Sequence, residues 1–223
     1  MPQLIEILKK TTFECVIPYE LQHGPSIRLD MNDTYWADAF KCDVKTLTQK
    51  TETLLREAHA VLAIGRYAED RAQLYARSDL FRDITGELRS VHLGVDLMVP
   101  SGTPVFSPCQ AVVHSMKDND RMGDFGATIV LTHKIEGCSF FTLYGHLSRA
   151  SLQGIKEGQL ISAGEQIGEV GNSEENGQWP PHLHFQIIRD MGDWRGGFPG
   201  VALASEAAYY LDLCPDPGLM LRL

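Results

Sequence analysis

Two histidines stand two residues apart in the segment WPPHLHFQ, residues 179–186. Alternate residues of a β-strand point to the same face of a sheet and lie about 7 Å apart, since the rise is about 3.3 Å per residue. His182 and His184 would therefore present both imidazole rings on one side. Such a pair fits a polar strand face, and it equally fits part of a site that binds a metal ion or transfers protons.

A second segment with reactive residue types is SVHLGVDLMVPSGTPVFSP, residues 90–108. On a straight strand His92 and Asp96 would lie about 13 Å apart, too far to share one metal ion. Gly94 lies between them, and glycine tolerates the bend or bulge that would turn both side chains toward one point. The alternative is a buried histidine and a turn aspartate that never meet.

A third segment, FFTLYGHLS, places His146 at the end of an aromatic run. Together the three segments offer four histidines and one aspartate. Neutral imidazoles and a carboxylate suit zinc, which in catalytic sites takes three protein ligands and keeps one position open. The chain has no HExxH motif, so the spare histidines would have to serve as acid and base, which their pKa near neutrality allows.

The order HLGVD, YGHLS, PHLHF resembles the lysostaphin/LytM-type zinc endopeptidases, and SGTPVFSP and KEGQLISAGEQIGEVGNS resemble the connecting segments of that domain. The resemblance covers about residues 90–190. It implies that zinc is held by His92, Asp96 and His184, and that His146 and His182 act on the attacking water and the developing oxyanion. The implied activity is hydrolysis of an amide bond in a peptide or muropeptide-like substrate, as an endopeptidase or amidase.

The N-terminal part carries a finer resemblance. AIGRYAEDRAQLYARSDLF and ENGQWPPHLHFQ are similar to the peptidase-like segment fused to class III aminotransferases and to domains resembling small-molecule kinases. Typical lysostaphin/LytM-type proteins are exported and cut peptidoglycan, whereas this closer resemblance implies an intracellular substrate. The first residues show no apolar run followed by a small-residue cleavage site, so we expect a cytoplasmic protein.

Two other functions remain open on the residues. A LytM-type fold can persist as a non-catalytic binding or regulatory module, and a phosphocarrier-like β-sandwich also uses two close histidines. The second leaves the HxxxD carboxylate without a role. We expect structural or surface roles for the other histidines, His23, His59, His114 and His133, and leave open whether Tyr144, Asn176 and Trp179 border the cleft.

The elements that must position these residues are mostly short strands. From about residue 90, β-branched and aromatic runs alternate with turn residues. The predicted strands are 91–97, 103–108, 110–116, 127–135, 139–147, 159–164, 166–171 and 182–190. Short strands separated by turns are typical of antiparallel sandwiches and barrels. We therefore predict a mainly β protein, α+β overall, with a LytM-like sandwich or barrel-like core over 90–223.

Residues 1–89 are predicted to form an irregular, partly helical region that packs on this core. Asp43 is a candidate cap for a helix in which apolar residues recur at helical spacing up to Leu62, and Gly65 would close it. Residues 4–10 form a short amphipathic stretch, 12–21 are strand-like, and 201–213 form a candidate C-terminal helix.

Composition narrows the possible partners and the possible cellular location further. The formal charge of −9 argues against nucleic acid or an anionic membrane as the main partner. Five scattered cysteines, with no CxxC pair, support neither a disulfide framework nor a zinc ribbon, and reduced thiols agree with the expected cytoplasmic location. The sequence contains no run of 18 apolar residues, so no membrane-spanning helix is predicted.

Overall fold

The computed structural model describes the chain except for residues 1, 20, 22–24, 32, 34–35, 37–43 and 77–78. The predicted cap Asp43 and the histidine His23 lie outside the described residues. Within the described part, no helix has the length and apolar composition needed to cross a bilayer.

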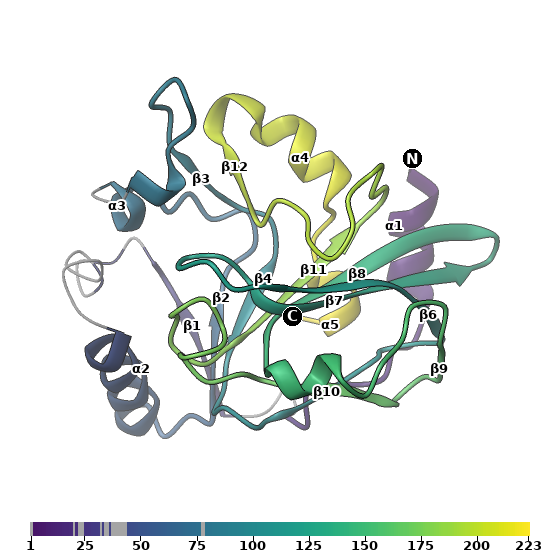
Figure 1. The fold of residues 1–223 in the computed structure, drawn as a ribbon, viewed down its shortest axis with the longest axis horizontal. Helices are drawn as coiled ribbons and strands as arrows, with labels where there is room; N and C mark the ends of the chain where they lie inside the picture. The colour runs from purple at the N-terminus through teal and green to yellow at the C-terminus, as the bar shows by residue number, and fades with distance from the viewer. Residues whose placement is uncertain are drawn as a thin grey trace.

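The centre of the fold is one eight-stranded sheet (Figure 1). Its strands, in spatial order, are β1 (Ser26–Leu29), β2 (Leu62–Gly65), β4 (Val95–Met98), β11 (Leu183–Ile188), β8 (Cys138–Leu147), β7 (Gly126–Ile135), β6 (Ala111–Asn119) and β9 (Leu160–Ile161). The β1–β2 pair is parallel and the other pairs are antiparallel, so the sheet is mixed.

Two small antiparallel sheets complete the strand arrangement. One joins β5 (Pro104–Phe106) to β10 (Gln166–Glu169), and the other joins β3 (Arg89–His92) to β12 (Val201–Leu203). The mainly β class is confirmed. The described strands form an open mixed sheet rather than a closed barrel, because the end strands β1 and β9 of the large sheet have no pairing with each other.

The predicted strand over 91–97 is in fact two strands in different sheets. The chain leaves β3 at His92, passes Leu93 and Gly94, and enters β4 at Val95. β4 lies between β2 and β11, whereas β3 pairs with β12. The chain therefore bends at Leu93 and Gly94, and we call this bend the corner between β3 and β4. His92 lies just before the corner and Asp96 just after it.

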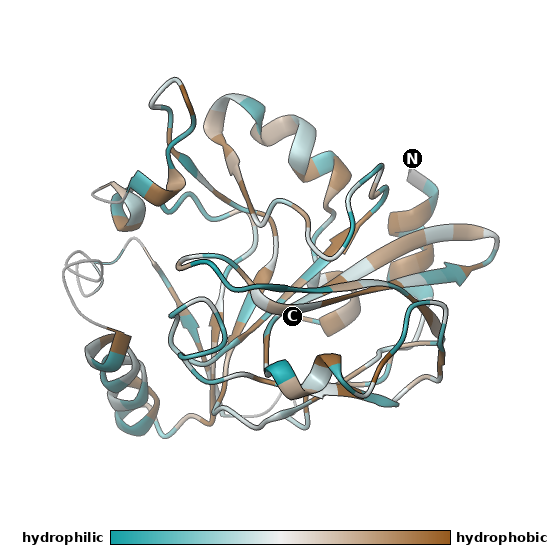
Figure 2. Cartoon of the chain, viewed as in Figure 1, coloured by the Kyte–Doolittle hydropathy of each residue, from teal (hydrophilic) through white to brown (hydrophobic). Residues whose placement is uncertain are grey.

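The helices lie around the strands. They are α1 (Pro2–Lys10), α2 (Val44–Glu57), α3 (Ala72–Tyr75), α4 (Ala207–Leu213) and α5 (Gly218–Leu221), with 3-10 turns η3 (Asp79–Phe81), η4 (Arg149–Leu152) and η5 (Ala204–Glu206). In Figure 1, α1 and α2 lie at opposite ends of the molecule. The central strands are largely hydrophobic and α2 is largely hydrophilic (Figure 2).

The helix predicted to reach Leu62 ends earlier, and this part of the prediction is wrong. It ends at Glu57, His59 adopts a left-handed φ of 50°, and Leu62–Gly65 form the buried strand β2. A continuous apolar run suits a strand covered on both faces as well as it suits a helix. The run VLAIG therefore has no periodicity that could distinguish a buried strand from a continuation of the helix.

The termini differ from their predictions in smaller ways. Residues 4–10 are helical as part of α1, whereas the described residues of 12–21 form no strand and run beside the β5 region through the Phe106 N–Val16 O bond of 2.9 Å. The predicted C-terminal helix begins with the strand β12 before continuing as η5 and α4.

Three hydrophobic clusters hold these layers together. The largest joins α1 and α5 to the central strands, a second packs α2, α3 and β1 beside β2, and the third lies under α4. Because β2 is hydrogen-bonded to β4, the N-terminal region continues the same sheet as the predicted core.

Candidate metal centre

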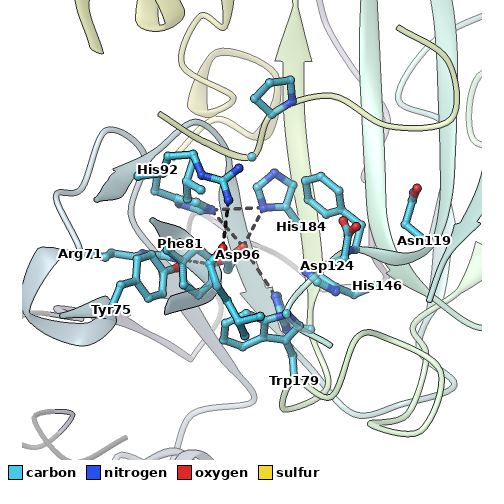
Figure 3. A pocket seen from close by; sticks show the side chains of 18 of the residues that line it. Arg71, Tyr75, Phe81, His92, Asp96, Asn119, Asp124, His146, Trp179 and His184 are labelled. Atoms are coloured by element: carbon cyan, nitrogen blue, oxygen red, sulfur yellow. Dashed lines mark hydrogen bonds and ion pairs between the residues drawn. The ribbon is translucent and has the colours of Figure 1, made fainter. Parts of the chain in front are cut away.

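Three of the predicted ligands meet where the two sheets join. His92 ends β3, Asp96 lies in β4, and His184 lies in β11 directly opposite Asp96 in the strand register. Asp96 Oδ1 is 3.3 Å from His92 Nε2 and 3.1 Å from His184 Nδ1, and the two nitrogens are 3.2 Å apart. All three side chains are buried and directed to one point (Figure 3).

The size of this triangle fits a zinc ion. With ligand bonds near 2.0–2.1 Å, neighbouring ligand atoms of a tetrahedral zinc site are about 3.3–3.4 Å apart. The three measured separations are 3.1, 3.2 and 3.3 Å. The triangle therefore needs almost no rearrangement to accept the ion.

Hydrogen bonds on the outer side of each ring show which nitrogens carry protons. His92 Nδ1 donates to the carbonyl oxygen of Arg66 at 2.9 Å, and His184 Nε2 donates to Gln186 Oε1 at 2.9 Å. The Gln186 amide is oriented in turn by its own donation to Pro199 O and Cys214 Sγ. In the neutral rings the nitrogens facing Asp96 are thus unprotonated.

Electrostatics keep the donors in the forms that bind a cation. Burial, with the nearby Arg71 charge, lowers the pKa of His92 to about 4, so this ring is neutral at neutral pH. Burial alone would raise the pKa of the Asp96 carboxyl, but the Arg71 guanidinium, with Nη1 2.8 Å from Oδ2, helps to hold it well below its usual value. Two ring nitrogens and one carboxylate oxygen converge on one point, and a bound cation would satisfy all three.

The other two predicted histidines stand beside this triangle. The rings of His146 and His182 are 4.2 Å apart between centroids, and His182 Nε2 is 3.8 Å from Asp96 Oδ1. His146 Nδ1 donates to Asn176 O at 2.8 Å, and His182 Nδ1 donates to Pro180 O at 2.7 Å. Burial lowers the pKa of both rings, so each is neutral with Nε2 left as an acceptor.

A local irregularity aims His146 into the site. Tyr144 pairs with Ile129 and Leu147 with Ala127, so β8 has one extra residue at this point. His146 takes a φ of 63° there. Tyr144 consequently points into the core beside Phe185, fully buried, and not into the cleft that a simple two-residue period would have shared with His146.

A cleft of about 590 Å³ opens onto the five residues. One wall is apolar and aromatic and comes mostly from the N-terminal region, with Tyr75, Phe81 and Trp179 among its members. Trp179 lies 6.5 Å from His146 between ring centroids and so borders the cleft. Asn176 is fully buried and acts through its carbonyl on His146 instead.

The remaining described histidines lie elsewhere. His133 is buried in a polar contact with Thr142 Oγ1 at 2.7 Å, which agrees with the predicted packing role. His114 contacts Ser115 at 2.8 Å, and His59 is exposed after α2. None of these three lines the cleft.

Gly94 is required for space. A Cβ at this position would lie 2.6 Å from ring atoms of His184 and 2.8 Å from the carbonyl oxygen of Phe185. Its φ is not in the left-handed region. The predicted importance of Gly94 thus has a different basis from backbone freedom, because the corner packs directly against a candidate ligand.

Several residues of the site were missed in the sequence. Gln186 follows His184 by two residues and so shares its strand face, a signal that could have identified it. Arg71 and Glu69 lie in the segment AIGRYAEDRAQLYARSDLF, but nothing in that segment indicated a contact with Asp96. They reach the site because backbone bonds join residues 68–71 to β3, including His92 N to Glu69 O at 2.9 Å.

In a comparison with known protein families, residues 90–194 match the family model described as Peptidase family M23. The L-Ala--D-Glu endopeptidase of Bacillus subtilis is 34% identical over 109 residues, which are 47% of this chain and 31% of that protein. The peptidoglycan DD-endopeptidase ShyA of Vibrio cholerae is 34% identical over 97 residues, 44% of this chain and 20% of that protein. The chain thus spans less than a third of these relatives.

Solved structures give partial superpositions. A zinc-containing peptidase from Vibrio cholerae aligns with 29% identity and a TM-score of 0.37, over 48% of this chain and 29% of that one. The catalytic domain of lysostaphin from Staphylococcus simulans aligns with 24% identity and a TM-score of 0.42, over 60% of this chain and 81% of that one.

Proposed function

We propose that the chain is a zinc-dependent hydrolase that cleaves an amide bond in a peptide. The observation that carries this proposal is the convergence of two ring nitrogens and one carboxylate oxygen, separated by 3.1–3.3 Å, beside two further buried histidines in a cleft. His92, Asp96 and His184 would hold the ion. The match to Peptidase family M23 and the endopeptidase names of the relatives support the same reaction class.

The bound ion would lower the pKa of a water molecule and polarise the scissile carbonyl. His146 and His182 then supply the proton chemistry. Each ring is anchored through Nδ1 to a backbone carbonyl, so its Nε2 can accept a proton only from the cleft side. The imidazolium formed can stabilise the oxyanion by donation and pass its proton to the departing amine.

The cleft walls support a peptide substrate with a carboxylate group. The cleft lining includes Lys117 and Arg121, both exposed, on a protein whose overall charge is −9. Exposed cations at a cleft attract anionic ligands. Peptidoglycan-derived peptides, the substrates that the relatives' names indicate, are therefore the first class to test.

The finer resemblance of the N-terminal part belongs to the proposal as well. The segment over 63–81, similar to the peptidase-like segment fused to class III aminotransferases, contributes Arg71, Tyr75 and Phe81 to the cleft lining. We propose on this ground a cytoplasmic protein with an intracellular peptide substrate. Recovery of native protein in a periplasmic or culture fraction, without a lysis marker, would contradict this location.

The test combines metal analysis with substrate profiling. Protein purified without added metal is analysed for zinc and then incubated with peptide and muropeptide libraries before and after chelation. We expect about one zinc per chain and cleavage that chelation abolishes and zinc restores. Zinc binding without any cleavage would favour the alternative, a LytM-fold binding module, and absence of zinc binding would contradict the proposal itself.

A further inference from the structure

A buried arginine outside the family match touches a candidate metal ligand. Arg71 Nη1 lies 2.8 Å from Asp96 Oδ2, and the two side chains are only 5% and 4% exposed. Residue 71 precedes the matched range of 90–194. The carboxylate of Asp96 is thus divided, with Oδ1 facing His92 and His184 and Oδ2 facing the guanidinium.

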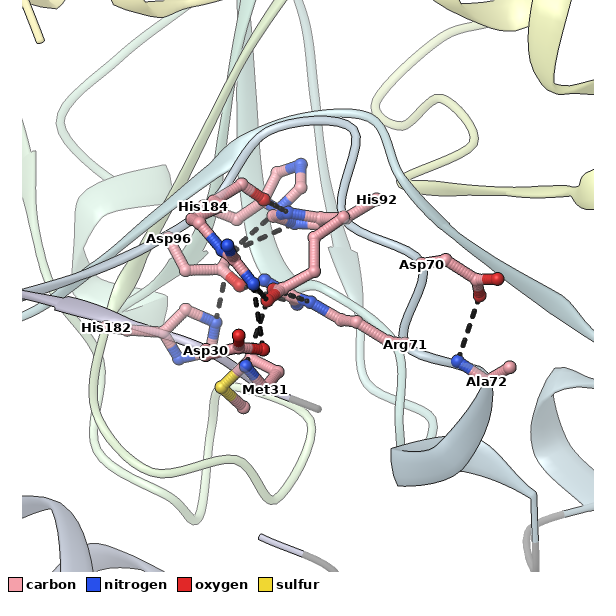
Figure 4. A network of polar contacts seen from close by, with 11 residues as sticks. Asp30, Met31, Asp70, Arg71, Ala72, His92, Asp96, His182 and His184 are labelled. Atoms are coloured by element: carbon pink, nitrogen blue, oxygen red, sulfur yellow. Dashed lines mark hydrogen bonds and ion pairs between the residues drawn. The ribbon is translucent and has the colours of Figure 1, made fainter. Parts of the chain in front are cut away.

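Glu69 holds this arginine in place. Arg71 Nε donates to Glu69 Oε2 at 3.1 Å, and the Glu69 side chain is 1% exposed. The other carboxylate oxygen of Glu69 accepts hydrogen bonds from Met31 N at 2.9 Å and from Arg66 Nη2 at 3.0 Å. Glu69, Arg71 and Asp96 therefore form a continuous buried chain of charge-assisted hydrogen bonds. Figure 4 labels Arg71 and Asp96 within this network.

The backbone of the same segment is joined to the strand that carries His92. Ala68 N donates to His92 O, His92 N donates to Glu69 O, and Arg71 N donates to Ser90 O, each at 2.9 Å. The Arg66 carbonyl accepts the proton of His92 Nδ1. Residues 66–71 thus orient two of the three candidate ligands from outside the motifs.

From this geometry we infer that Arg71 is a positioning residue for the metal centre, fixed by Glu69. It holds Asp96 so that one oxygen faces the ion and the other is turned away. A planar guanidinium can bridge two carboxylates at once, whereas a lysine ammonium is a single point charge. The inference rests on the proposed function, because it requires that His92, Asp96 and His184 bind zinc.

The test uses the full chain with Arg71→Lys, which keeps the charge but cannot span both carboxylates. Zinc affinity is measured by competition with a chelator, and the visible absorption spectrum is recorded after cobalt replaces zinc. We expect about 10- to 100-fold weaker zinc binding, as for other residues that orient metal ligands, and a changed cobalt spectrum. The matched control is Arg89→Lys, since Arg89 also lines the cleft but donates to Leu80 O.

The control is expected to bind zinc like the parent. Equal zinc affinity and an unchanged cobalt spectrum in Arg71→Lys, with the parent binding zinc and cleaving peptide, would overturn the inference alone. No zinc binding by the parent would overturn the proposed function and this inference with it.

Glu69→Gln leaves Arg71 and Asp96 unchanged, and it is the second test variant if Arg71→Lys does not fold. It should show a smaller loss of zinc affinity, and a folded variant with parental affinity would overturn the role of Glu69.

Discussion

At the scale of single residues, the two histidines of the HLH segment have different surroundings: His184 lies in β11, whereas His182 directly precedes this strand and, contrary to the prediction, is not part of it. His184 Nδ1 is 3.1 Å from Asp96 Oδ1, whereas His182 Nε2 is 3.8 Å from the same atom. The first distance is an edge of the ligand triangle. The second leaves His182 beside the triangle but outside it.

Substitution of each histidine should separate these roles. His184→Ala removes one of three protein ligands, so zinc content and hydrolysis should fall together. His182→Ala should keep zinc and lose activity by about 10²- to 10⁴-fold, because it removes a group that acts on the reacting water. Zinc content is measured beside turnover on a cleaved substrate. Zinc loss in His182→Ala with zinc kept in His184→Ala would reverse the assignment.

His146→Ala is the companion variant, and it should resemble His182→Ala. The two rings are 4.2 Å apart and both lie within the same buried group. Groups that act on one transition state are strongly coupled. The double variant should therefore lose much less activity than the product of the two single losses.

At the scale of elements, the corner between β3 and β4 decides whether the ligands meet. The corner passes so close to β11 that a Cβ at Gly94 would lie 2.6 Å from the His184 ring. The glycine therefore provides space at this contact.

Gly94→Ala and Gly94→Val should therefore displace His184 and weaken zinc binding, valine more than alanine. Forcing extra atoms into a packed site costs about 1–3 kcal/mol, while β6, β7 and β8 should remain folded. Circular dichroism checks the fold and chelator competition gives the affinity. Gly154→Ala is a control for the loss of a glycine, since a Cβ there meets nothing within 4 Å and the backbone is not in the left-handed region. Parental zinc affinity in a folded Gly94→Val would contradict this geometry.

Most strands, and the grouping of His92, Asp96, His146, His182 and His184 in one cleft, could be predicted because their signals are local. Short β-branched runs and three motifs in a fixed order are visible in the sequence itself. The division of residues 91–97 between two sheets could not be predicted, since it depends on pairing with β12, more than a hundred residues away. Arg71 and Glu69 were missed for the same reason, as only the folded chain brings them to Asp96.

At the scale of the whole molecule, buried neutral histidines connect stability to pH. His133 packs far from the cleft against Phe140, and burial lowers its pKa to about 4 from a usual value of 6.5. Between these two values the unfolded chain binds the proton and the folded chain does not. Stability is therefore full above about pH 6.5 and declines as the pH falls toward 4.

For His133 alone, lowering the pH from 7 to 5 should cost about 2 kcal/mol of folding free energy. The pKa of His92 is lowered in the same way, so the whole protein should lose more folding free energy than His133 alone accounts for. Urea unfolding of metal-free protein at both pH values measures the effect, and His133→Gln should reduce it by about the amount assigned to His133. An equal pH dependence in the variant would show that His133 is not buried neutral.

The corner between the two sheets also has a consequence for local motion. His92 is held by the small β3–β12 sheet, while Asp96 and His184 belong to the large one, so an ion bound by all three would fasten one sheet to the other. Amide hydrogen exchange of Val91 and Ala202 should accordingly slow when zinc is added and quicken when it is chelated. Exchange in β7, at the far side of β8, should stay the same. The small sheet would then open and close on its own whenever the ion is absent.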